Sequence, residues 1–322
     1  IGEQLGLYRA MADAGPLTPG QLAVRTGTDE RYVREWLCAQ AAGGYVDFDA
    51  GRGTFSLPDE RAYALAVEDS PAYLPGAFQI ISAVMKDTPK LLEAFRTGEG
   101  VGWDEHDAAL FEGTERFFRP NYAANLVSSW LPALEGVVPK LEAGARVADV
   151  GCGHGASTTL MAQAFPRSTF VGFDYHGPSV GSARRSSAKQ RIGNVSFQVS
   201  TAKDFHGDPY DLVAFFDCLH DMGDPVGAAK HVREMLAPEG TWMIVEPFAH
   251  DAIQGNLNPV GRLFYCASTM ICTPASRAQE VGLCLGAQAG EERIRRVVGE
   301  GGFGRFRRAA ETPFNVVYEA RA

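Results

Sequence analysis

The chain has 322 residues, of which 45% are hydrophobic and 21% charged, and its formal net charge is −9. This apolar content excludes a disordered chain, and the length suggests about two domains. The negative charge gives no global electrostatic case for binding nucleic acid. No run approaches the roughly 18 apolar residues that are needed to span a bilayer.

Two further features indicate a soluble, cytoplasmic protein. Residues 1–4 contain no basic segment followed by an apolar one, so nothing there marks export. The six cysteines are scattered without paired spacing, which is typical of reduced thiols rather than of a disulfide framework. We therefore expect a cytoplasmic location and no membrane partner.

The first part of the chain alternates short helical patterns with turn signals. Helical periodicity is found in residues 4–14, 18–24 and 28–40, and the second of these begins with a capping box at Thr18. Two short strand-like runs, 45–48 and 54–57, follow and form a hairpin around a glycine-rich loop. Three helices followed by a hairpin are the order of a winged helix-turn-helix. We therefore predict such a domain over residues 1–80.

The middle part, residues 81–140, has a helical pattern that is rich in aromatic side chains, among them Phe95, Trp103, Phe111 and Tyr122. Ordinary core packing explains such a stripe, and so does a lid over a small-molecule pocket. We predict a helical linker or lid and leave the two interpretations open.

Strands alternate with helices in residues 141–322. The strands are expected at 146–150, 169–173, 195–199, 210–216 and 241–245, and the helices between them at 156–164, 179–190 and 225–236. A last strand pair is expected at 304–309 and 314–320. This alternation predicts an α/β fold with a mostly parallel sheet, which binds its ligand at the carboxyl ends of the strands.

A glycine-rich loop lies where the first of these strands turns into its helix. The loop contains Gly151, Gly153 and Gly155, Asp149 precedes it by two positions, and Asp174 ends the second strand. A carboxylate at the position of Asp174 can accept hydrogen bonds from both hydroxyls of a ribose. The spacing of the loop differs from the G-x-G-x-x-G of nicotinamide-binding sites. An acidic residue just before the loop favours a ligand with an amine and no pyrophosphate, such as S-adenosylmethionine.

Residues 144–246 resemble the class I S-adenosylmethionine-dependent methyltransferases, a Rossmann-like fold. The resemblance is carried by residues 147–155 as the first motif, by Phe173-Asp174-Tyr175 as the ribose-binding strand, and by residues 210–221 and 236–241. The terminal strand pair fits the antiparallel edge of that sheet. With its winged helix, the whole chain is similar to bacterial small-molecule methyltransferases and to plant-type O-methyltransferases, whose N-terminal domain serves dimerisation.

The resemblance implies S-adenosylmethionine as co-substrate and a set of residues that bind it. These are Asp149, Gly151, Cys152, Gly153, Gly155, Asp174, Tyr175, Thr201, Ala202 and Asp217. The chain departs from the family after the third strand, where an acidic residue near the adenine amine is usual. Thr201 occupies that place here, with Asp204 three residues later and a backbone amide at Ala202 available.

The catalytic candidates follow the fourth strand. Leu219-His220-Asp221-Met222 resembles the His-Asp-aromatic segment that carries the base in plant-type O-methyltransferases. His220 is thus either the general base for a hydroxyl acceptor, with Asp221 orienting its ring, or a residue that lines the cofactor pocket. Glu246 and Asp251, after the fifth strand, are candidates for contact with the acceptor. No spacing resembles a zinc cluster, so we expect no metal.

The sequence favours methyl transfer to a small-molecule acceptor by a homodimer, and it leaves other functions open. A DNA-binding regulator is disfavoured because residues 1–80 contain eleven Asp or Glu against six Arg and no Lys, a net charge of −5. A nicotinamide oxidoreductase is disfavoured by the loop spacing, and a cofactor-binding protein without methyl transfer stays open. The dimer is expected because the N-terminal domain has more apolar side chains than it could bury alone: Leu5, Tyr8, Met11, Trp36, Leu37, Tyr45 and Phe48.

Overall fold

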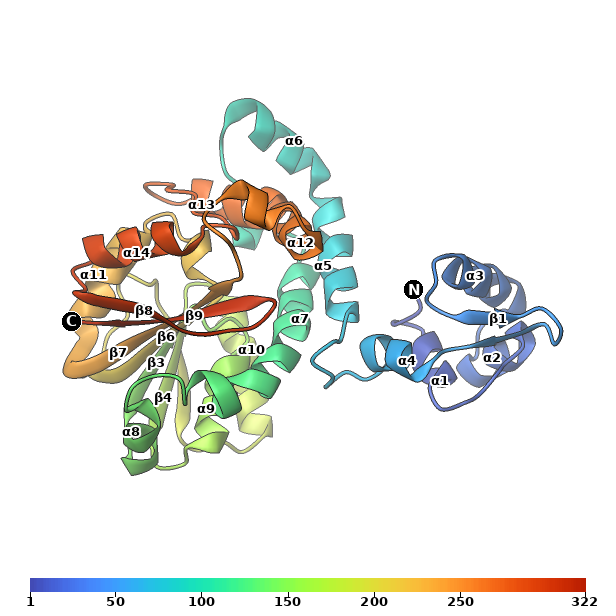
Figure 1. Ribbon diagram of the computed structural model, residues 1–322, viewed down its shortest axis with the longest axis horizontal. Coiled ribbons are helices and arrows are strands. Elements are labelled where there is room, and N and C mark those ends of the chain that lie inside the picture. Colours follow the sequence, from blue (N-terminus) through green and yellow to red (C-terminus); the bar gives the residue numbers. More distant parts are fainter. The chain divides into compact units, whose positions relative to one another are not determined.

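The computed structural model describes residues 1–322, and the chain divides into two compact units. Residues 1–78 with 116–121 form the first unit, and residues 79–115 with 122–322 form the second. Figure 1 labels the elements in chain order, with the first unit mostly in blue. Helix α7 (Ala109–Asn125) is the one element whose middle turn belongs to the first unit while its two ends belong to the second.

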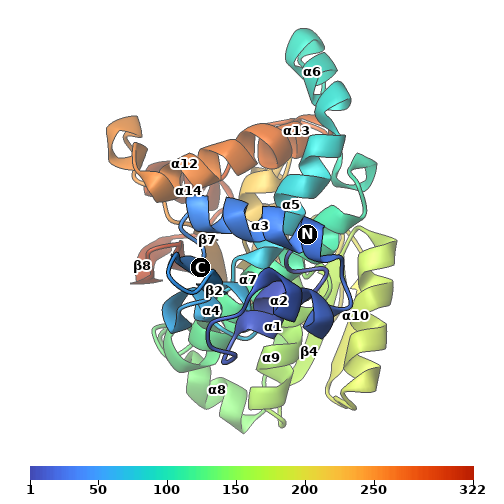
Figure 2. The same cartoon turned by 90° about the vertical axis from the view of Figure 1, so that its right-hand side faces the viewer.

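The first unit has the predicted winged helix-turn-helix order, seen face-on in blue in Figure 2. Thr18 forms the expected capping box with Gln21, and the Asp29 carboxylate accepts two backbone N–H groups at the start of the third helix. The elements are α1 (Leu7–Met11), α2 (Pro19–Thr26), α3 (Glu30–Ala42), the antiparallel hairpin of β1 (Asp47–Asp49) and β2 (Thr54–Ser56), and α4 (Asp59–Leu65).

The first unit buries more of its apolar side chains than the sequence led us to expect. Tyr8, Met11 and Leu37 lie in its own core, so they are not part of an apolar surplus. Leu5, Tyr45 and Phe48 remain exposed, as the sequence suggested. The expectation was wrong for the first three because α4 packs against α1 and enlarges the core, with Ala62 and Leu65 as its buried members.

A seven-stranded sheet forms the centre of the second unit. Its order is β5-β4-β3-β6-β7-β9-β8, and the first five strands are parallel while β9 runs antiparallel to both its neighbours. This is the predicted Rossmann-like sheet with its antiparallel edge. The strands are β3 (Arg146–Val150), β4 (Thr169–Asp174), β5 (Val195–Val199), β6 (Tyr210–Phe216), β7 (Leu236–Pro247), β8 (Arg305–Glu311) and β9 (Asn315–Arg321).

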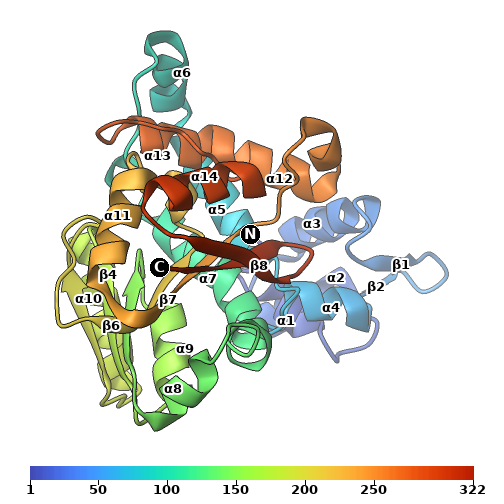
Figure 3. The same ribbon diagram turned by 60° about the vertical axis from the view of Figure 1, so that its left-hand side comes forward.

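Helices cover both faces of this sheet. Figures 1 and 3 show α11 and α14 on one face and α8 and α9 on the other. The face under α11 and α14 carries the largest core, in which Phe215, Trp242 and Val298 are fully buried. The helices are α8 (Val137–Ala143), α9 (Ala156–Ala164), α10 (Gly177–Lys189), α11 (Pro225–Met235) and α14 (Glu291–Glu300), with the short turn η3 (Leu219–Asp221) after β6.

Two further helical segments of the second unit lie beside each other. Ala83 and Val84 of the linker form a buried cluster with Leu110 and with Ile271 of the insertion after β7, and Figure 2 shows the two segments side by side. The linker contains α5 (Pro75–Lys86), α6 (Thr88–Thr97), η1 (Trp103–Glu105), α7 and the π-helical turn η2 (Leu126–Trp130). The insertion contains η4 (Ile253–Asn256), α12 (Pro259–Ala267), the π-helical turn η5 (Ser268–Cys272) and α13 (Thr273–Arg277). None of the helices combines the length and the apolar composition that a membrane crossing requires.

Candidate active site

The predicted cofactor residues lie at the carboxyl ends of four adjacent strands, β5, β4, β3 and β6. Val150, the last residue of β3, pairs with Phe173 of β4 on one side and with Phe215 of β6 on the other. The backbone N–H groups of Gly151 and Cys152 both donate to the Phe173 carbonyl, which fixes the start of the loop. The loop therefore opens at the edge of the sheet where parallel α/β folds bind their ligands.

The three glycines of the loop are required by its backbone and its neighbours. Gly151, Gly153 and Gly155 all have positive φ, at 76°, 51° and 79°. A Cβ at Gly151 would lie 2.7 Å from the Cys218 Sγ, and one at Gly155 would lie 2.5 Å from the Phe197 ring. A Cβ at Gly153 would meet nothing within 4 Å. The first and third glycines thus allow tight packing, whereas the middle one faces open space in which a ligand fits.

Asp149 is completely buried beneath this loop. Its Oδ2 accepts hydrogen bonds from the hydroxyls of Ser157 and Thr158, both at 2.6 Å, while its Oδ1 has no partner. Burial raises the pKa of the Asp149 carboxyl to about 6, against the opposing effect of the two hydroxyls. A buried acceptor without a donor is costly, so the residue fits a ligand that brings a positive charge or an N–H group.

Asp174 links the glycine loop to the next helix. Its Oδ2 accepts from the Gly153 N–H and its Oδ1 from the His176 N–H, both at 2.8 Å, and burial raises the pKa of this carboxyl. Each oxygen keeps a second lone pair, so a ribose diol remains a possible donor. The following residue, Tyr175, has a side chain that is half exposed.

The segment after β5 is held by short-range contacts. The Thr201 hydroxyl donates to Asp204 Oδ2 at 2.6 Å and accepts from the Lys203 N–H. Ala202 packs against the main core. The carboxylate that the family usually has at the position of Thr201 is thus replaced by a hydroxyl bound to Asp204.

Two cysteines of the site are packing residues. Cys152 is buried against Val180, Ala183 and Phe197, and burial raises the pKa of its thiol well above the usual value. The Cys218 thiol donates to the Val150 carbonyl. Neither thiol has the thiolate character that a nucleophile needs.

Asp217, which follows β6, has a strained backbone and two polar partners. Its φ is 49°, which side chains other than glycine rarely adopt. The Tyr122 hydroxyl donates to its Oδ2 at 2.7 Å and the Asn315 amide to its Oδ1 at 2.8 Å. Burial raises the pKa of the carboxyl to about 7, so it takes up a proton near neutral pH.

His220 lies between two carboxylates in the turn η3. Its Nδ1 is 2.5 Å from Glu246 Oε2, and its Nε2 is 3.1 Å from Asp221 Oδ1. The second oxygen of Glu246 accepts from the Leu219 N–H at 3.0 Å, which fixes the carboxylate of β7 beneath the ring. Asp221 thus contacts the ring, and its orienting role stays a prediction. The sequence named Glu246 as a possible acceptor contact and missed that it holds the histidine.

The two carboxylates set the protonation of the ring. Burial lowers the pKa of the His220 imidazole, but the charges of Asp221 and Glu246 outweigh this effect and raise it well above the usual value. The two carboxylates therefore favour the protonated form of the ring in the free protein. A cation placed nearby would shift the ring toward its neutral, proton-accepting form.

The linker contributes four contacts to this edge of the sheet within the second unit. Trp103 donates to Asp221 Oδ2 at 3.1 Å, and the Phe111 ring stacks on His176 with the centroids 4.1 Å apart. Glu115 pairs with His154 at 2.8 Å, and Tyr122 binds Asp217 as described above. His154 thus pairs with the linker and does not cap α9, which has Gly155 at its N-cap and no side-chain cap.

His220, Asp221 and Cys272 also present a possible set of metal ligands. One ligand atom of each lies within 4.8 Å of the others. The sequence gave no sign of this group because Cys272 is far along the chain. Burial raises the pKa of the Cys272 thiol to about 12, which disfavours the thiolate that metals prefer. The absence of a metal stays a prediction.

Two family models match the chain. Residues 141–296 match a model described as a methyltransferase domain, and residues 1–67 match one described as an Rv2258c-like winged HTH domain. The two models match the predicted N-terminal domain and most of the predicted α/β domain.

The curated relatives match between 30% and 47% of the chain. It is 29% identical over 107 residues to a trans-aconitate 2-methyltransferase from Deinococcus radiodurans, covering 33% of this chain and 40% of that protein. It is 23% identical over 156 residues to a ubiquinone biosynthesis O-methyltransferase from Acinetobacter baylyi, covering 47% of this chain and 59% of that protein. It is 24% identical over 108 residues to a non-reducing polyketide synthase from Emericella nidulans, covering 31% of this chain and 4% of that protein. The chain thus spans less than two thirds of each of these relatives.

The solved structures match nearly the whole chain. Human N-acetylserotonin methyltransferase in complex with S-adenosylmethionine has a TM-score of 0.70 at 16% identity, covering 99% of this chain and 91% of that one. The mitomycin 7-O-methyltransferase MmcR has a TM-score of 0.68 at 18% identity, covering 100% and 92%. These likenesses show the fold, including the N-terminal unit. The two family models show a methyltransferase domain that follows an N-terminal winged helix-turn-helix domain, so the chain is an S-adenosylmethionine-dependent methyltransferase.

Proposed function

We propose that the chain transfers the methyl group of S-adenosylmethionine to a hydroxyl group of a small molecule, with His220 as the general base. The observation that carries this proposal is the buried pairing of His220 with Glu246 at the edge of the sheet where the glycine loop opens. S-Adenosylmethionine supplies a methyl group on a positively charged sulfur. The oxygen–carbon bond forms as the carbon–sulfur bond breaks, the bonding electrons stay on sulfur, and the hydroxyl proton passes to the Nε2 of His220.

The residues of the chain bind, orient and shield the reactants. Asp149 offers its free Oδ1 to the ammonium group of the co-substrate, and Asp174 accepts from the ribose hydroxyls. Glu246 accepts from the Nδ1–H of His220, which leaves the Nε2 to accept the proton once the acceptor hydroxyl takes the place that Asp221 Oδ1 has beside it in the free protein. Trp103 and Phe111 exclude water from this edge of the sheet. Because the reaction is a direct displacement, such positioning and exclusion of water supply most of the acceleration.

The relatives support an oxygen acceptor. Several of the similar structures and curated proteins are named O-methyltransferases, although the trans-aconitate enzyme is not. A second candidate is a protein that binds the co-substrate without methyl transfer. No feature of the site favours it, because the histidine–glutamate pair would then have no function.

The test replaces His220 by Gln and by Ala. Transfer of a radiolabelled methyl group to a panel of phenols and hydroxy acids should fall by roughly 10²–10⁴ in both variants, because the proton acceptor is lost. Binding of S-adenosylhomocysteine, measured by calorimetry, should stay nearly unchanged and would show that the variants fold. His206→Ala, at an exposed histidine, is the matched control. Wild-type turnover in His220→Gln would exclude the base role.

We also infer that the first unit joins two subunits and does not bind DNA. On α3, Arg31 pairs with Glu35 and Arg34 with Glu30, so these arginines are neutralised within the helix rather than offered to phosphates. Exposed apolar side chains remain at Val24, Tyr32 and Phe48, which are 84%, 80% and 53% exposed. A two-fold interface would bury them.

Light scattering tests this assembly and should give a mass near twice 34.7 kDa. Tyr32→Glu should shift the mass toward that of one chain, whereas Arg52→Glu, in the exposed hairpin loop, should leave it unchanged. A monodisperse monomer of the full chain, or binding to duplex DNA with sequence preference, would contradict the proposal. The cytoplasmic location likewise stays a prediction, consistent with six free cysteines.

A further inference from the structure

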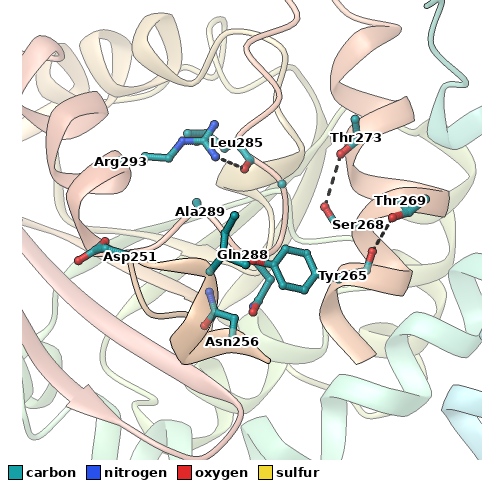
Figure 4. Close-up of a pocket in the computed structure, with 12 residues that line it drawn as sticks. Asp251, Asn256, Tyr265, Ser268, Thr269, Thr273, Leu285, Gln288, Ala289 and Arg293 are labelled. Atoms are coloured by element: carbon teal, nitrogen blue, oxygen red, sulfur yellow. Dashed lines mark hydrogen bonds between the residues drawn. The ribbon is translucent and has the colours of Figure 1, made fainter. Parts of the chain in front are cut away.

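A second cavity lies beside the reaction centre in the second unit. It has a volume of about 360 Å³ and lies between α12 and η5, the loop that contains η4, and the segment that leads into α14 (Figure 4). This volume is within the range of small-molecule sites. None of the residues assigned above to the co-substrate or to proton transfer lines it.

A few residues separate the cavity from the region around His220. Cys272 lies close to His220 and Asp221, whereas Ser268 and Thr273 of the same helical stretch line the cavity. Gly286 also lines the cavity, and its N–H donates to the His220 carbonyl at 3.2 Å. A Cβ at Gly286 would lie 2.7 Å from the Ser268 Oγ, so this wall admits no larger residue there. The cavity is thus a separate compartment next to the catalytic turn.

One end of the cavity carries two opposite charges that do not pair with each other. Arg293 donates to the carbonyls of Leu285 and Cys284, and no carboxylate lies within 4.0 Å of its guanidinium. Asp251 accepts the Glu292 N–H at 2.8 Å and has no cationic partner. Figure 4 shows Arg293 and Asp251 on the same side of the cavity. A ligand with one negative and one positive group would satisfy both.

Gln288, between these charges and Tyr265, adds a fixed hydrogen-bond acceptor. Its Nε2 donates to the carbonyls of Phe248 and Ala287, both at 3.0 Å, which determines the orientation of the amide. Its Oε1 is closed off from solvent and has no donor. The remaining wall near Gln288 includes the Tyr265 ring and the buried side chains of Leu285 and Ala289, which suit a carbon side chain.

We propose that this cavity binds a free α-amino acid. The Arg293 guanidinium holds the carboxylate, Asp251 holds the ammonium group, and the side chain lies against Tyr265. An α-amino acid is a small ligand that carries one negative and one positive group on the same carbon atom. The site goes beyond methyl transfer, because no atom of the bound amino acid reacts there.

The test uses the full chain saturated with S-adenosylhomocysteine, so that the amino-acid end of the co-substrate cannot account for binding. Saturation-transfer NMR with each of the common L-amino acids identifies the ligand, and calorimetry gives its Kd. The analogues of that amino acid without the ammonium group and without the carboxylate should each bind at least about tenfold more weakly. Failure of every amino acid to bind, or equal binding of either analogue, overturns the proposal.

Variants locate the site. Asp251→Asn keeps the acceptor for the Glu292 N–H but removes the charge, and Arg293→Met removes the guanidinium; each should weaken binding at least about tenfold. Arg293→Lys should bind better than Arg293→Met, which separates loss of charge from a disturbed loop. Arg296→Met, on the same helix and outside the cavity, should bind like the wild type. Equal effects of Arg293→Met and Arg296→Met, or displacement of the amino acid by excess S-adenosylhomocysteine, would contradict the assignment. These experiments do not measure methyl transfer, so their outcome does not depend on whether His220 is the base.

Discussion

The Nδ1 of His220 lies 2.5 Å from the Oε2 of Glu246, and both side chains are buried. Glu246 directly follows the part of β7 that pairs with β6, and His220 lies in the turn after β6, so two neighbouring strands bring together residues that are 26 positions apart. The carboxylate both orients the ring and raises its pKa. The pKa of His220 therefore depends on a residue of the sheet as well as on its neighbour Asp221 in the turn.

Replacement of Glu246 by Gln should shift the pH dependence of methyl transfer. The wild-type kcat/KM should rise with pH through the raised pKa of His220, because only the neutral ring accepts a proton. In Glu246→Gln the pKa should fall, and the rise should begin at lower pH with a lower plateau, since a weaker base remains. The measurement is the pH profile of kcat/KM, with the exposed Glu239→Gln as control. Identical profiles for the two variants would show that Glu246 does not tune the ring.

Asp149 should make co-substrate binding depend on pH. Its pKa of about 6 in the free protein means that the carboxyl is protonated in mild acid and charged at neutral pH. Affinity for the ammonium group of S-adenosylhomocysteine should therefore increase as the pH rises from about 5 to about 7. Calorimetry across this range, with release of a proton on binding at the lower end, is the measurement. Asp149→Asn should bind more weakly and with a smaller pH dependence; an unchanged dependence would remove Asp149 from the site.

Asp174→Ala should weaken the binding of S-adenosylhomocysteine by about 1.5–3 kcal/mol, because two hydrogen bonds to a carboxylate are lost. The Gly153 N–H would also lose its acceptor, so the melting temperature without ligand is measured alongside. Asp208→Ala, at a largely exposed carboxylate, is the control and should bind normally. Equal affinity of the two variants would exclude a ribose contact at Asp174.

The periodic parts of the fold could be predicted from the sequence because local patterns determine them. β3, α9 and β5 lie where the apolar runs and helix starts placed them, and the glycine loop follows from the strand–turn–helix order. Each strand of the site could therefore be predicted from its own local sequence pattern.

The partners of the site residues could not be predicted, because they depend on contacts between distant segments. Tyr122 meets Asp217 across 95 positions, and Trp103 meets Asp221 across 118. The sequence allowed two interpretations of the aromatic stretch of the linker, core packing and a lid. These two hydrogen bonds show that the stretch contacts Asp217 and Asp221 directly. The position of Cys272 beside His220 could not be predicted for the same reason, because only the fold of the insertion after β7 brings the two residues together.

The central claim is that His220 lies at the point of methyl transfer, and its pKa in two complexes tests this most directly. S-Adenosylmethionine carries a positive charge on sulfur and S-adenosylhomocysteine does not, while the rest of the two molecules is alike. Nitrogen-15 NMR of the imidazole should give a pKa about one unit or more lower in the first complex, because a nearby sulfonium disfavours the imidazolium. The same pKa in both complexes would place His220 away from the sulfur and contradict its role as the base.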